Sequence, residues 1–362
     1  MNFLKQLQTS IERHHLLNPG DKVIVAVSGG PDSMALLYGL KHLRLTWGLR
    51  LHIAHFNHRL RKSADRDQKF VERQAAANHI PSTLGVNLKS SLSRHGSLEE
   101  FAREQRIAFL IQTARKQKAA VIALGHTRDD LAETVLMRIL RGTGLEGLKG
   151  MLPKTELYGF PFVRPLLEVS HNDIERFLNQ IRIPYCLDPT NRSLKFFRNK
   201  IRLKLLPFLE KNLNVRIKEH LAHLSETCAQ DYDFLFKVAN RQMKKIMLPF
   251  KNKRIIRFRL GPFQRQPLAQ QRMLVRLAVE QLMGPHYSLY LNHMKEMEKL
   301  LSSCPMGTVV HLPSRLWMKK EKDTFILSRT KMSLGKSRRK FVFFPENRYN
   351  INSNSNIKTE KI

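Results

Sequence analysis

Residues 23–33 join a buried type of β-strand to a glycine-rich turn, and this junction constrains the fold more than any other part of the chain. The segment reads Val-Ile-Val-Ala-Val-Ser-Gly-Gly-Pro-Asp-Ser and continues into a helix-forming run at residues 34–37. At such a turn, free backbone N–H groups and the positive end of the helix dipole converge on one point. The glycines leave room for an anion, and the serine hydroxyls add donors. The expected anion-binding residues are Ser28, Gly29, Gly30, Pro31, Asp32 and Ser33.

The turn lacks the lysine that holds a transferring γ-phosphate in loops of the type Gly-x-x-x-x-Gly-Lys-Ser/Thr. Instead it carries Asp32, an acid placed where a bound metal would help to shield phosphate charge. Such a loop suits holding pyrophosphate while the α-phosphate is attacked. It resembles the PP-loop ATP pyrophosphatase superfamily, whose members adenylate a substrate oxygen and release pyrophosphate. The resemblance implies ATP as a substrate together with Mg²⁺, and an ordinary strand–turn–helix connection is the alternative.

The charge balance of the chain points to a polyanionic partner. Among 362 residues, 63 are Lys or Arg and 30 are Asp or Glu, which gives a net charge of +33. Nucleic acid is the leading partner on this ground, and an acidic membrane surface is the second. No apolar run reaches the roughly 18 residues that span a bilayer, and the N-terminus lacks the continuous apolar core of a signal peptide. We therefore expect a cytoplasmic protein without a membrane partner.

Strand-like and helix-like runs alternate over the first part of the chain. Apolar runs at 23–27, 51–54 and 121–124 are separated by helical patterns at 65–78 and 98–117. This alternation predicts an α/β fold with an N-terminal doubly wound parallel sheet, which the resemblance identifies as the PP-loop (adenine nucleotide alpha hydrolase-like) type. Because ligands bind at the carboxyl ends of strands in such sheets, the residues that follow the three runs should meet at one site.

The pattern changes near Pro207 to a long helical seam, with apolar residues at steps of three and four. Short β-like runs follow at 308–312 and 324–327. The domains expected from these changes are a PP-loop ATP-binding catalytic domain over 1–206, a helical linker over 207–245, a mainly helical second domain over 246–330, and a basic, poorly ordered tail over 331–362.

Two histidines follow the second strand-like run, in the segment His55-Phe56-Asn57-His58-Arg59-Leu60-Arg61. Histidine and arginine side chains at the exit of a strand can face a phosphate or a base. We therefore take His55 and His58 as candidates for nucleotide binding. A solvated basic turn is the alternative.

The third run leads into Gly-His-Thr-Arg-Asp-Asp-Leu-Ala-Glu-Thr, where three acids fall within one helical turn. Crowded carboxylates repel one another unless they bind a metal, accept from an amine, or cap the helix. Capping explains one Asp but hardly all three acids. The candidates here are His126 for the nucleotide and Asp129, Asp130 and Glu133 for metal or amine contact, with Asp130 the foremost.

Farther along, Asp188-Pro189-Thr190-Asn191 precedes a basic helical segment that contains Arg198 and Arg202. Arginines at this spacing lie on one side of a helix and can pair with a phosphate or with AMP. A solvated basic helix explains the pattern equally well.

Taken in order, these segments are similar to the bacterial tRNA(Ile)-lysidine synthetase family. The motifs are Ser-Gly-Gly-Pro-Asp-Ser, His-Phe-Asn-His-Arg-Leu-Arg, Gly-His-Thr-Arg-Asp-Asp-x-Ala-Glu-Thr, Arg-Gly-Thr-Gly-Leu-Glu-Gly-Leu, and Asp-Pro-Thr-Asn followed by Arg-Asn-Lys-Ile-Arg. The match covers roughly residues 20–210, and the later helical part resembles the substrate-binding domain of the family more loosely. Leu131 stands where glutamine is usual, and the chain leaves no room for the complete final domain of the longer members.

The resemblance implies a ligase for tRNA modification that acts on the anticodon wobble cytidine of a tRNA(Ile) with a CAU anticodon. The cytidine C2 oxygen would attack the α-phosphate of ATP, and the ε-amine of L-lysine would then displace AMP. Lysidine would be the product, and the codon read would change from AUG to AUA.

The resemblance also implies roles for individual residues. The catalytic residues would be Asp32, Asp130, Glu133 and Arg198. The residues that bind the metal would be Asp32, Asp129 and Asp130. The cationic partners would be His58, Arg198 and Arg202. Asp130 or Glu133 would take the proton of the amine, and the sequence does not choose between them. Residues 246–330 would bind the tRNA. The oligomeric state is left open, with a homodimer among the alternatives.

Two rival functions remain at this point. A tRNA thiolating enzyme adenylates the same kind of oxygen and then delivers sulfur through cysteines or an iron–sulfur cluster. The chain has only Cys186, Cys228 and Cys304, far apart and without a Cys-x-x-Cys pair, which speaks against thiolation and excludes a disulfide framework within one chain. A basic RNA-binding protein with an inactive ATP fold is the other rival, and ATP turnover distinguishes it.

Overall fold

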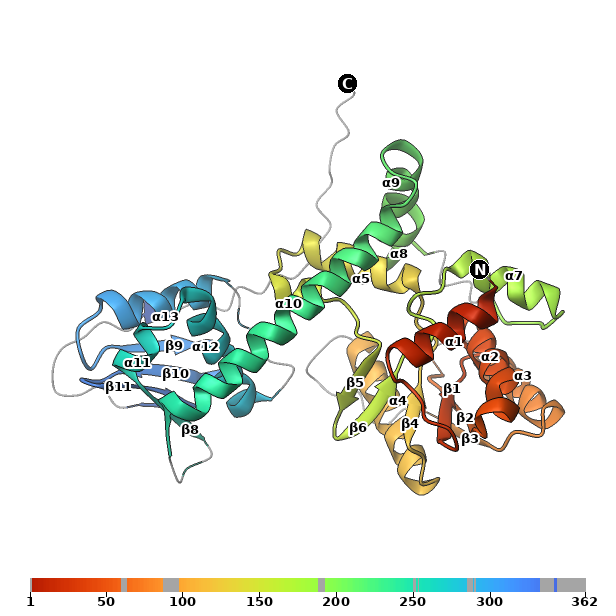
Figure 1. The fold of residues 1–362 in the computed structure, drawn as a ribbon, viewed down its shortest axis with the longest axis horizontal. Coiled ribbons are helices and arrows are strands. Elements are labelled where there is room, and N and C mark those ends of the chain that lie inside the picture. The colour runs from red at the N-terminus through yellow and green to blue at the C-terminus, as the bar shows by residue number, and fades with distance from the viewer. Residues whose placement is uncertain are drawn as a thin grey trace. The chain divides into compact units, whose positions relative to one another are not determined.

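The computed structural model describes residues 2–59, 64–86, 98–187, 193–249, 252, 254–284, 289, 291–332 and 342–343. By its contacts the chain divides into two compact units, Met1–Tyr232 and Asp233–Ile362 (Figure 1). The division falls inside the long helix α10 (Ile217–Ile246), later than the expected boundary after residue 206. The first part of α10 belongs to the N-terminal unit, because Leu221 packs in one apolar cluster with Leu131 and Leu206.

The N-terminal unit contains a six-stranded sheet in the order β3-β2-β1-β4-β6-β5. Neighbouring strands are parallel except for the antiparallel β5–β6 hairpin at one edge. The strands are β1 (Lys22–Ala26), β2 (Arg50–Asn57), β3 (Ser82–Val86), β4 (Val121–Ala123), β5 (Lys154–Leu157) and β6 (Phe160–Val163). The three strand-like runs of the sequence are β1, β2 and β4, and the α/β fold is confirmed. Since β1 pairs with both β2 and β4, the turn after it lies in the middle of the carboxyl edge.

Helices connect these strands and cover the sheet (Figure 1). They are α1 (Phe3–Arg13), α2 (Pro31–Trp47), α3 (Ala64–Ala77), α4 (Leu98–Lys116), α5 (Arg128–Leu140), α6 (Leu145–Leu148) and α7 (His171–Gln180). The helical patterns expected at 65–78 and 98–117 are α3 and α4. The unit continues with α8 (Phe197–Lys200), the π-helix η2 (Ile201–Leu205) and α9 (Leu206–Asn212) before α10 begins.

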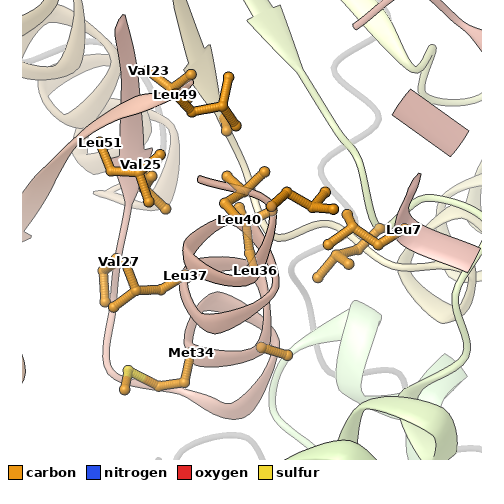
Figure 2. Close-up of a cluster of buried hydrophobic side chains, with 14 of the residues drawn as sticks. Leu7, Val23, Val25, Val27, Met34, Leu36, Leu37, Leu40, Leu49 and Leu51 are labelled. Carbon is orange, nitrogen blue, oxygen red and sulfur yellow. The ribbon is translucent and has the colours of Figure 1, made fainter. Parts of the chain in front are cut away.

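Strand β1 supplies apolar side chains to both faces of the sheet. Val23 and Val25 pack with Leu36 of α2 in one core cluster (Figure 2). Ile24, between them, packs with Leu110 of α4 in a second cluster. Alternation along one strand thus buries both faces, as a doubly wound sheet requires.

The β5–β6 hairpin and β3 were not expected from the sequence. The hairpin turns at Tyr158 and Gly159, both at positive φ (51° and 73°), the geometry of a tight two-residue connection. Strand β3 consists of exposed and partly buried residues and includes Gly85, so it lacks the buried apolar run that identified its neighbours.

The C-terminal unit has a sheet in the order β12-β9-β10-β11-β8-β7, antiparallel except between β12 and β9. Its strands are β7 (Met247–Leu248), β8 (Ile255–Arg259), β9 (Val309–Leu312), β10 (Leu316–Lys320), β11 (Thr324–Ser328) and β12 (Val342–Phe343). Its helices are α11 (Leu260–Gln264), α12 (Leu268–Met283), α13 (Leu291–Ser303) and the short η3 (Pro313–Arg315), besides the end of α10. Helices hold more of the described residues than strands do, as expected. The β-like runs at 308–312 and 324–327 are β9 and β11.

An aromatic cluster forms part of the core of this unit. Phe325 stacks on Phe258 with ring centroids 5.0 Å apart and meets Phe263 edge-on at 4.7 Å. Most of the tail expected over 331–362 lies outside the described residues; 342–343 within it form β12. Among the described helices, none is long and apolar enough to cross a membrane.

Candidate active site

The turn after β1 has the geometry of an anion cradle. Gly29 lies at φ +91°, a conformation that L side chains rarely adopt. Gly30 is the N-cap of α2, and Pro31 occupies its first turn. Because a glycine cap has no side chain, it does not occupy the first N–H groups of α2, and these groups can bind an oxyanion.

Hydrogen bonds within the turn hold it in this shape. The hydroxyl of Ser33 donates to the carbonyl of Gly30 at 2.9 Å and accepts from the N–H of Ser28 at 3.2 Å. The hydroxyls of the two serines lie 3.2 Å apart, and that of Ser28 accepts from the N–H of Gly30 at 3.3 Å. The serines therefore order the loop itself as well as offering donors.

The segment after β4 meets this turn at Gly125. A Cβ placed on Gly125 would lie 3.0 Å from the carbonyl oxygen of Asp32 and 3.1 Å from the nitrogen of Ser33. Both contacts are with backbone, which cannot swing aside as a flexible side chain can. Glycine is thus needed here for the close approach of the β4 exit to the start of α2.

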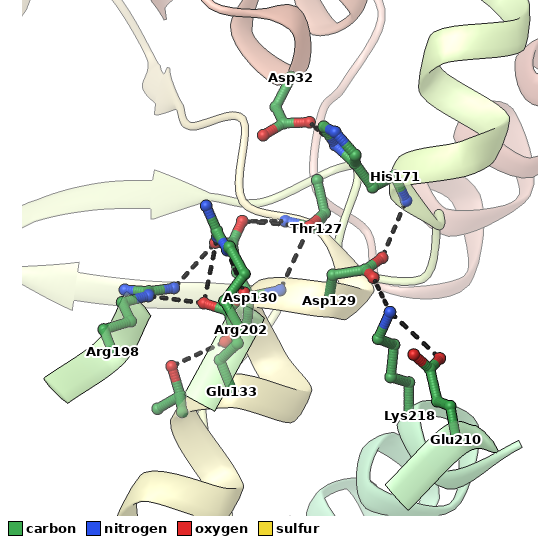
Figure 3. A network of polar contacts seen from close by, with 11 residues as sticks. Asp32, Thr127, Asp129, Asp130, Glu133, His171, Arg198, Arg202, Glu210 and Lys218 are labelled. Carbon is green, nitrogen blue, oxygen red and sulfur yellow. Dashed lines mark hydrogen bonds and ion pairs between the residues drawn. The ribbon is translucent and has the colours of Figure 1, made fainter. Parts of the chain in front are cut away.

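Two acids of α5 and two arginines from the α8–η2 segment form one cluster (Figure 3). Arg198 donates from Nη2 to Asp130 at 2.8 Å and from Nε to Glu133 at 2.7 Å. Arg202 donates from Nη2 to Asp130 at 3.0 Å and from Nε to Glu133 at 2.5 Å. The side chain of Glu133 is 1% exposed, against 38% and 37% for the arginines. The two carboxylates thus neutralise two guanidiniums that reach toward solvent.

The second oxygen of Asp130 caps its own helix. It accepts from the N–H and the hydroxyl of Thr127 at 3.0 and 3.1 Å, and the N–H of Asp130 donates back to that hydroxyl. Burial acts to raise the pKa of Asp130, but Arg198, the hydrogen bond from Thr127 and Arg202 outweigh it, so the pKa is lowered. Asp130 is thus held as a carboxylate by capping and by arginines together.

Asp129 points away from this cluster, toward α7 and α10 (Figure 3). It accepts from the N–H of His171 at 2.8 Å and from Nζ of Lys218 at 2.9 Å, and Lys218 also contacts Glu210 at 3.1 Å. Burial alone would raise the pKa of Asp129, but the bonds from Lys218 and His171 lower it. Asp129 therefore has partners of its own, whereas Asp130 and Glu133 share Arg198 and Arg202.

His171 connects Asp129 to the anion cradle. Its Nδ1 lies 2.9 Å from Oδ1 of Asp32. This hydrogen bond raises the pKa of His171 against the effect of burial. His171 was not among the residues expected at the site, although a helix-capping pattern, Ser170 followed three residues later by Asp173, marks the helix start beside it.

A pocket of about 180 Å³ opens between these groups. Its lining includes three carboxylates and three basic side chains, and the residues are Asp32, Thr127, Asp129, Glu133, His171, Asn172, Arg202, Leu206 and Lys218. Across the described residues, no group of three or more His, Cys, Asp or Glu side chains is arranged to hold a metal ion. The expected metal residues Asp32, Asp129 and Asp130 therefore do not form a three-ligand cage.

The histidines selected from the sequence lie at the same sheet edge but differ in their surroundings. His55 is buried in β2, and its Nδ1 donates to the carbonyl of Val27 at 2.8 Å, which ties β2 to the start of the anion-binding turn. His58 packs its ring edge-on against Phe56 at 4.9 Å. The bond of His55 thus supports the turn, and nucleotide contact by His55 and His58 stays a prediction.

His126, after β4, contacts an arginine that the sequence analysis did not select. Nε of Arg164 lies 3.2 Å from Nδ1 of His126. Burial, together with Arg164 and other arginines, lowers the pKa of His126 to about 3, although Asp130 acts to raise it. A signal for Arg164 exists, since it is a lone basic residue directly after the apolar run of β6. The segment 188–191 singled out in the sequence lies outside the described residues.

The chain matches the family described as PP-loop domain over residues 2–209. It is 31% identical over 365 residues to the tRNA(Ile)-lysidine synthase of Clostridioides difficile (strain 630), covering 100% of this chain and 76% of that protein. It is 33% identical over 315 residues to the bifunctional protein TilS/HprT of Listeria monocytogenes serovar 1/2a, covering 86% of this chain and 48% of that protein. The chain thus spans about half of this second relative.

A solved structure also resembles this one. The U34-tRNA thiolase NcsA from Methanococcus maripaludis, with its 4Fe-4S cluster, superposes with a TM-score of 0.53 and 20% identity, covering 62% of this chain and 77% of that chain. At this identity the likeness shows the fold alone.

Proposed function

The chain belongs to the tRNA(Ile)-lysidine synthase family of PP-loop enzymes, and we propose that it is an ATP-dependent ligase that joins lysine to the wobble cytidine of tRNA(Ile). The roles proposed for individual residues rest on one observation. Arg198 and Arg202 pair with Asp130 and Glu133 beside the anion cradle. A cradle alone is compatible with many phosphate-binding proteins. A cradle next to fixed cations and carboxylates offers separate places for pyrophosphate, AMP and an amine.

The reaction has two displacements. The C2 oxygen of the cytidine attacks the α-phosphorus of ATP, the bond to the β-phosphate oxygen breaks, and pyrophosphate leaves. The ε-amine of lysine then attacks C2, the bond between C2 and the activated oxygen breaks, and AMP leaves with that oxygen. The amine must be neutral when it attacks, so one proton has to pass to a base.

The N-terminal end of α2 is suited to the pyrophosphate. Its free N–H groups and the glycine backbone at Gly29 and Gly30 present donors without a side chain in the way. Arg198 and Arg202 are suited to the anionic AMP, because guanidinium groups that acids hold in place need little reorganisation when charge develops on a leaving group. Their partly exposed positions leave room for this contact.

Magnesium fits this site at Asp32. One oxygen of Asp32 contacts His171, and the side chain is 30% exposed, so the second oxygen can face a cation. Asp129 and Asp130 use both of their oxygens for backbone, hydroxyl or cationic donors. Mg²⁺ is commonly held by one or two carboxylates plus substrate phosphates, so a cage of three acids is not required. When bound, the ion would shield the charge of the phosphate oxygens.

The pocket beside Asp32 is suited to the lysine amine. Carboxylates of Asp32, Asp129 and Glu133 line it, and a lysine ammonium would share them with the cations His171, Lys218 and Arg202 that already contact them. Asp130 and Glu133 already carry two arginines, so a lysine that bound Glu133 would have to replace one of those contacts. We propose Glu133 as the group that accepts the proton of the amine, since it lines the pocket and Asp130 does not.

The nucleic acid partner is proposed from the charge of the chain and from the family. A surplus of 33 positive charges suits a tRNA, and a CAU anticodon supplies the wobble cytidine that the chemistry needs. The expected assignment of residues 246–330 to tRNA binding, and a cytoplasmic location, stay part of this proposal.

The test is incubation of the full chain with ATP, Mg²⁺, labelled L-lysine and tRNA(Ile) transcripts. We expect label in the CAU transcript and equimolar AMP and pyrophosphate, and none with a UAU transcript that differs only at the wobble base. A tRNA(Met) transcript tests discrimination, since it also has a wobble cytidine. Pyrophosphate release without lysine incorporation would contradict the proposal of a lysine ligase, although it would agree with adenylation of the tRNA.

A further inference from the structure

Arg164 is a buried arginine that the proposed chemistry does not yet use. The residue is 6% exposed and directly follows β6. Its Nη1 donates to the carbonyl of Leu152 at 2.7 Å and to the hydroxyl of Thr155 at 3.1 Å. These contacts fix the guanidinium plane, and its Nε then meets Nδ1 of His126 at 3.2 Å.

The chemistry of the two groups decides where the proton of His126 lies. A guanidinium keeps all its protons in a protein and has no acceptor, so Nε of Arg164 can only donate. Nδ1 of His126 must therefore offer its lone pair. The ring is then neutral and carries its one hydrogen on Nε2. Burial among arginines, which lowers the pKa of His126, favours the same neutral state.

The sheet places this pair at the proposed site. Strands β4 and β6 are parallel neighbours, with Ala123 opposite Val163, so His126 and Arg164 leave the same carboxyl edge of the sheet. His126 is partly exposed, and within the described parts of the chain no hydrogen bond engages its Nε2. A donor at this edge lies on the same side of the sheet as the anion cradle after β1.

We propose that Arg164 is a positioning residue, which holds His126 as the Nε2–H tautomer so that it donates to an anionic oxygen of the nucleotide. The inference rests on the proposed function for the identity of that nucleotide, ATP. A neutral donor of this kind keeps its proton near neutral pH and needs no reorientation when the nucleotide arrives. An imidazole that is free to change tautomer would, for part of the time, direct the lone pair of Nε2 at the phosphate, and this lone pair would repel the phosphate oxygens.

The first experiment needs no substrate. Full-length protein labelled with ¹⁵N-histidine is examined by NMR from pH 5.5 to pH 8.5, and His126→Gln identifies the resonances of His126. We expect one protonated nitrogen, Nε2, across this range. Protonation of Nδ1 at pH 7, as tautomer or as imidazolium, would overturn the proposal even if the enzyme makes lysidine.

The second experiment measures the effect on the nucleotide. Arg164→Met removes the donor, Arg164→Lys keeps a cation without the planar group, and Arg73→Met, on the exposed side of α3, is the matched control. In Arg164→Met we expect His126 to titrate at a higher pH, with kcat/KM for ATP at least tenfold lower and the affinity for tRNA unchanged. Arg164→Lys should fall between this variant and the wild type, and Arg73→Met should match the wild type.

Wild-type kinetics with the ¹⁵N signals of His126 unchanged in a folded Arg164→Met would overturn the proposal. If Arg164→Met does not fold, the tautomer of His126 in the wild type and the kinetics of Arg164→Lys test the proposal instead. A wild-type protein with the expected tautomer whose signal shifts on adding ATP, but which incorporates no lysine, would support the role of Arg164 and contradict only the proposed ligase.

Discussion

Arg202 and Glu133 form a bidentate ion pair, in which Nε of Arg202 donates to Oε1 of Glu133 at 2.5 Å and Nη2 of Arg202 donates to Oε2 at 3.1 Å. Arg198 donates to the same Oε2 at 2.7 Å. The hydrogen bonds that Arg202 donates to Glu133 raise the pKa of Arg202 against the effect of burial. One nearly buried carboxylate therefore fixes the direction of both guanidiniums.

Replacing Glu133 by glutamine should lower both turnover and stability. The change keeps the shape but leaves two cations with only Asp130 as a counter-charge. This costs about 2 kcal/mol, less than the roughly 3–5 kcal/mol of a fully buried pair, because both arginines are more than a third exposed. We expect kcat to fall at least a hundredfold and the free energy of unfolding to fall by about that amount. Urea unfolding and lysine incorporation measure the two effects. Glu12→Gln, on an exposed position of α1, is the control, and normal turnover in folded Glu133→Gln would contradict the assignment.

Asp32→Ala should abolish pyrophosphate release while the fold and the affinity for tRNA stay nearly unchanged. The carboxylate is partly exposed, so its loss leaves no buried charge of its own behind. Asp32→Asn should retain weak activity that needs a higher Mg²⁺ concentration, since an amide oxygen is a poorer ligand for the ion than a carboxylate. Pyrophosphate release measured against Mg²⁺ concentration checks both variants. An unchanged Mg²⁺ dependence in Asp32→Asn would remove Asp32 from the metal site.

Gly125→Ala should damage ATP binding more than it damages the fold. The added methyl group meets the backbone of Asp32 at 3.0 Å, so the anion-binding turn has to move by a few tenths of an ångström. We expect the Kd for ATP to rise at least tenfold, measured by calorimetry. Gly261→Ala is a matched control, because a Cβ there meets nothing within 4 Å and its φ is not positive. Equal ATP affinity in both variants would show that the turn adapts.

His126 should make the stability of the protein fall with acid. Its pKa is lowered from an ordinary 6.5 to about 3 in the folded chain, so the unfolded chain binds the proton more readily. The contribution of neutral His126 to the free energy of unfolding is complete above pH 6.5. It is lost as the pH falls toward 3, and the free energy of unfolding then decreases by up to about 1.4 kcal/mol per pH unit. Urea unfolding at pH 7.5, 6 and 5 should show a smaller acid loss for His126→Gln than for the wild type. Parallel pH dependences would contradict a neutral His126 in the folded chain.

A fragment of residues 1–232 should fold alone, whereas a fragment of 1–206 should not fold stably. The shorter cut removes Leu221, which packs against Leu131, and Lys218, which pairs with Asp129. Circular dichroism and urea unfolding of the two fragments test this. Equal stability would show that the start of α10 is not needed. The 1–232 fragment should still bind ATP but should distinguish tRNA(Ile) from tRNA(Met) poorly if the second unit reads the tRNA.

The sequence was sufficient for features that depend on neighbours along the chain. A buried strand, two glycines and a helix-forming run identified the anion cradle, because turn geometry and helix capping act over a few residues. The same holds for the three acids on one turn of α5. The alternation of strands and helices also gave the α/β fold, since crossover connections admit few arrangements.

Local pattern could not decide which charges would meet. Glu133 and Arg198 are 65 residues apart, His126 and Arg164 are 38 apart, and Asp32 and His171 are 139 apart. The acids of α5 were compatible with a metal, an amine or a cap, and only packing of the α8–η2 segment against α5 gave Asp130 and Glu133 their arginines. Arg164 and His171 were likewise not among the residues selected from the sequence. The partners of Arg164 and His171 depend on which strand ends and helix starts meet at one edge of the sheet. Tertiary packing decides this, because each charge at that edge is stabilised by a group distant in the chain.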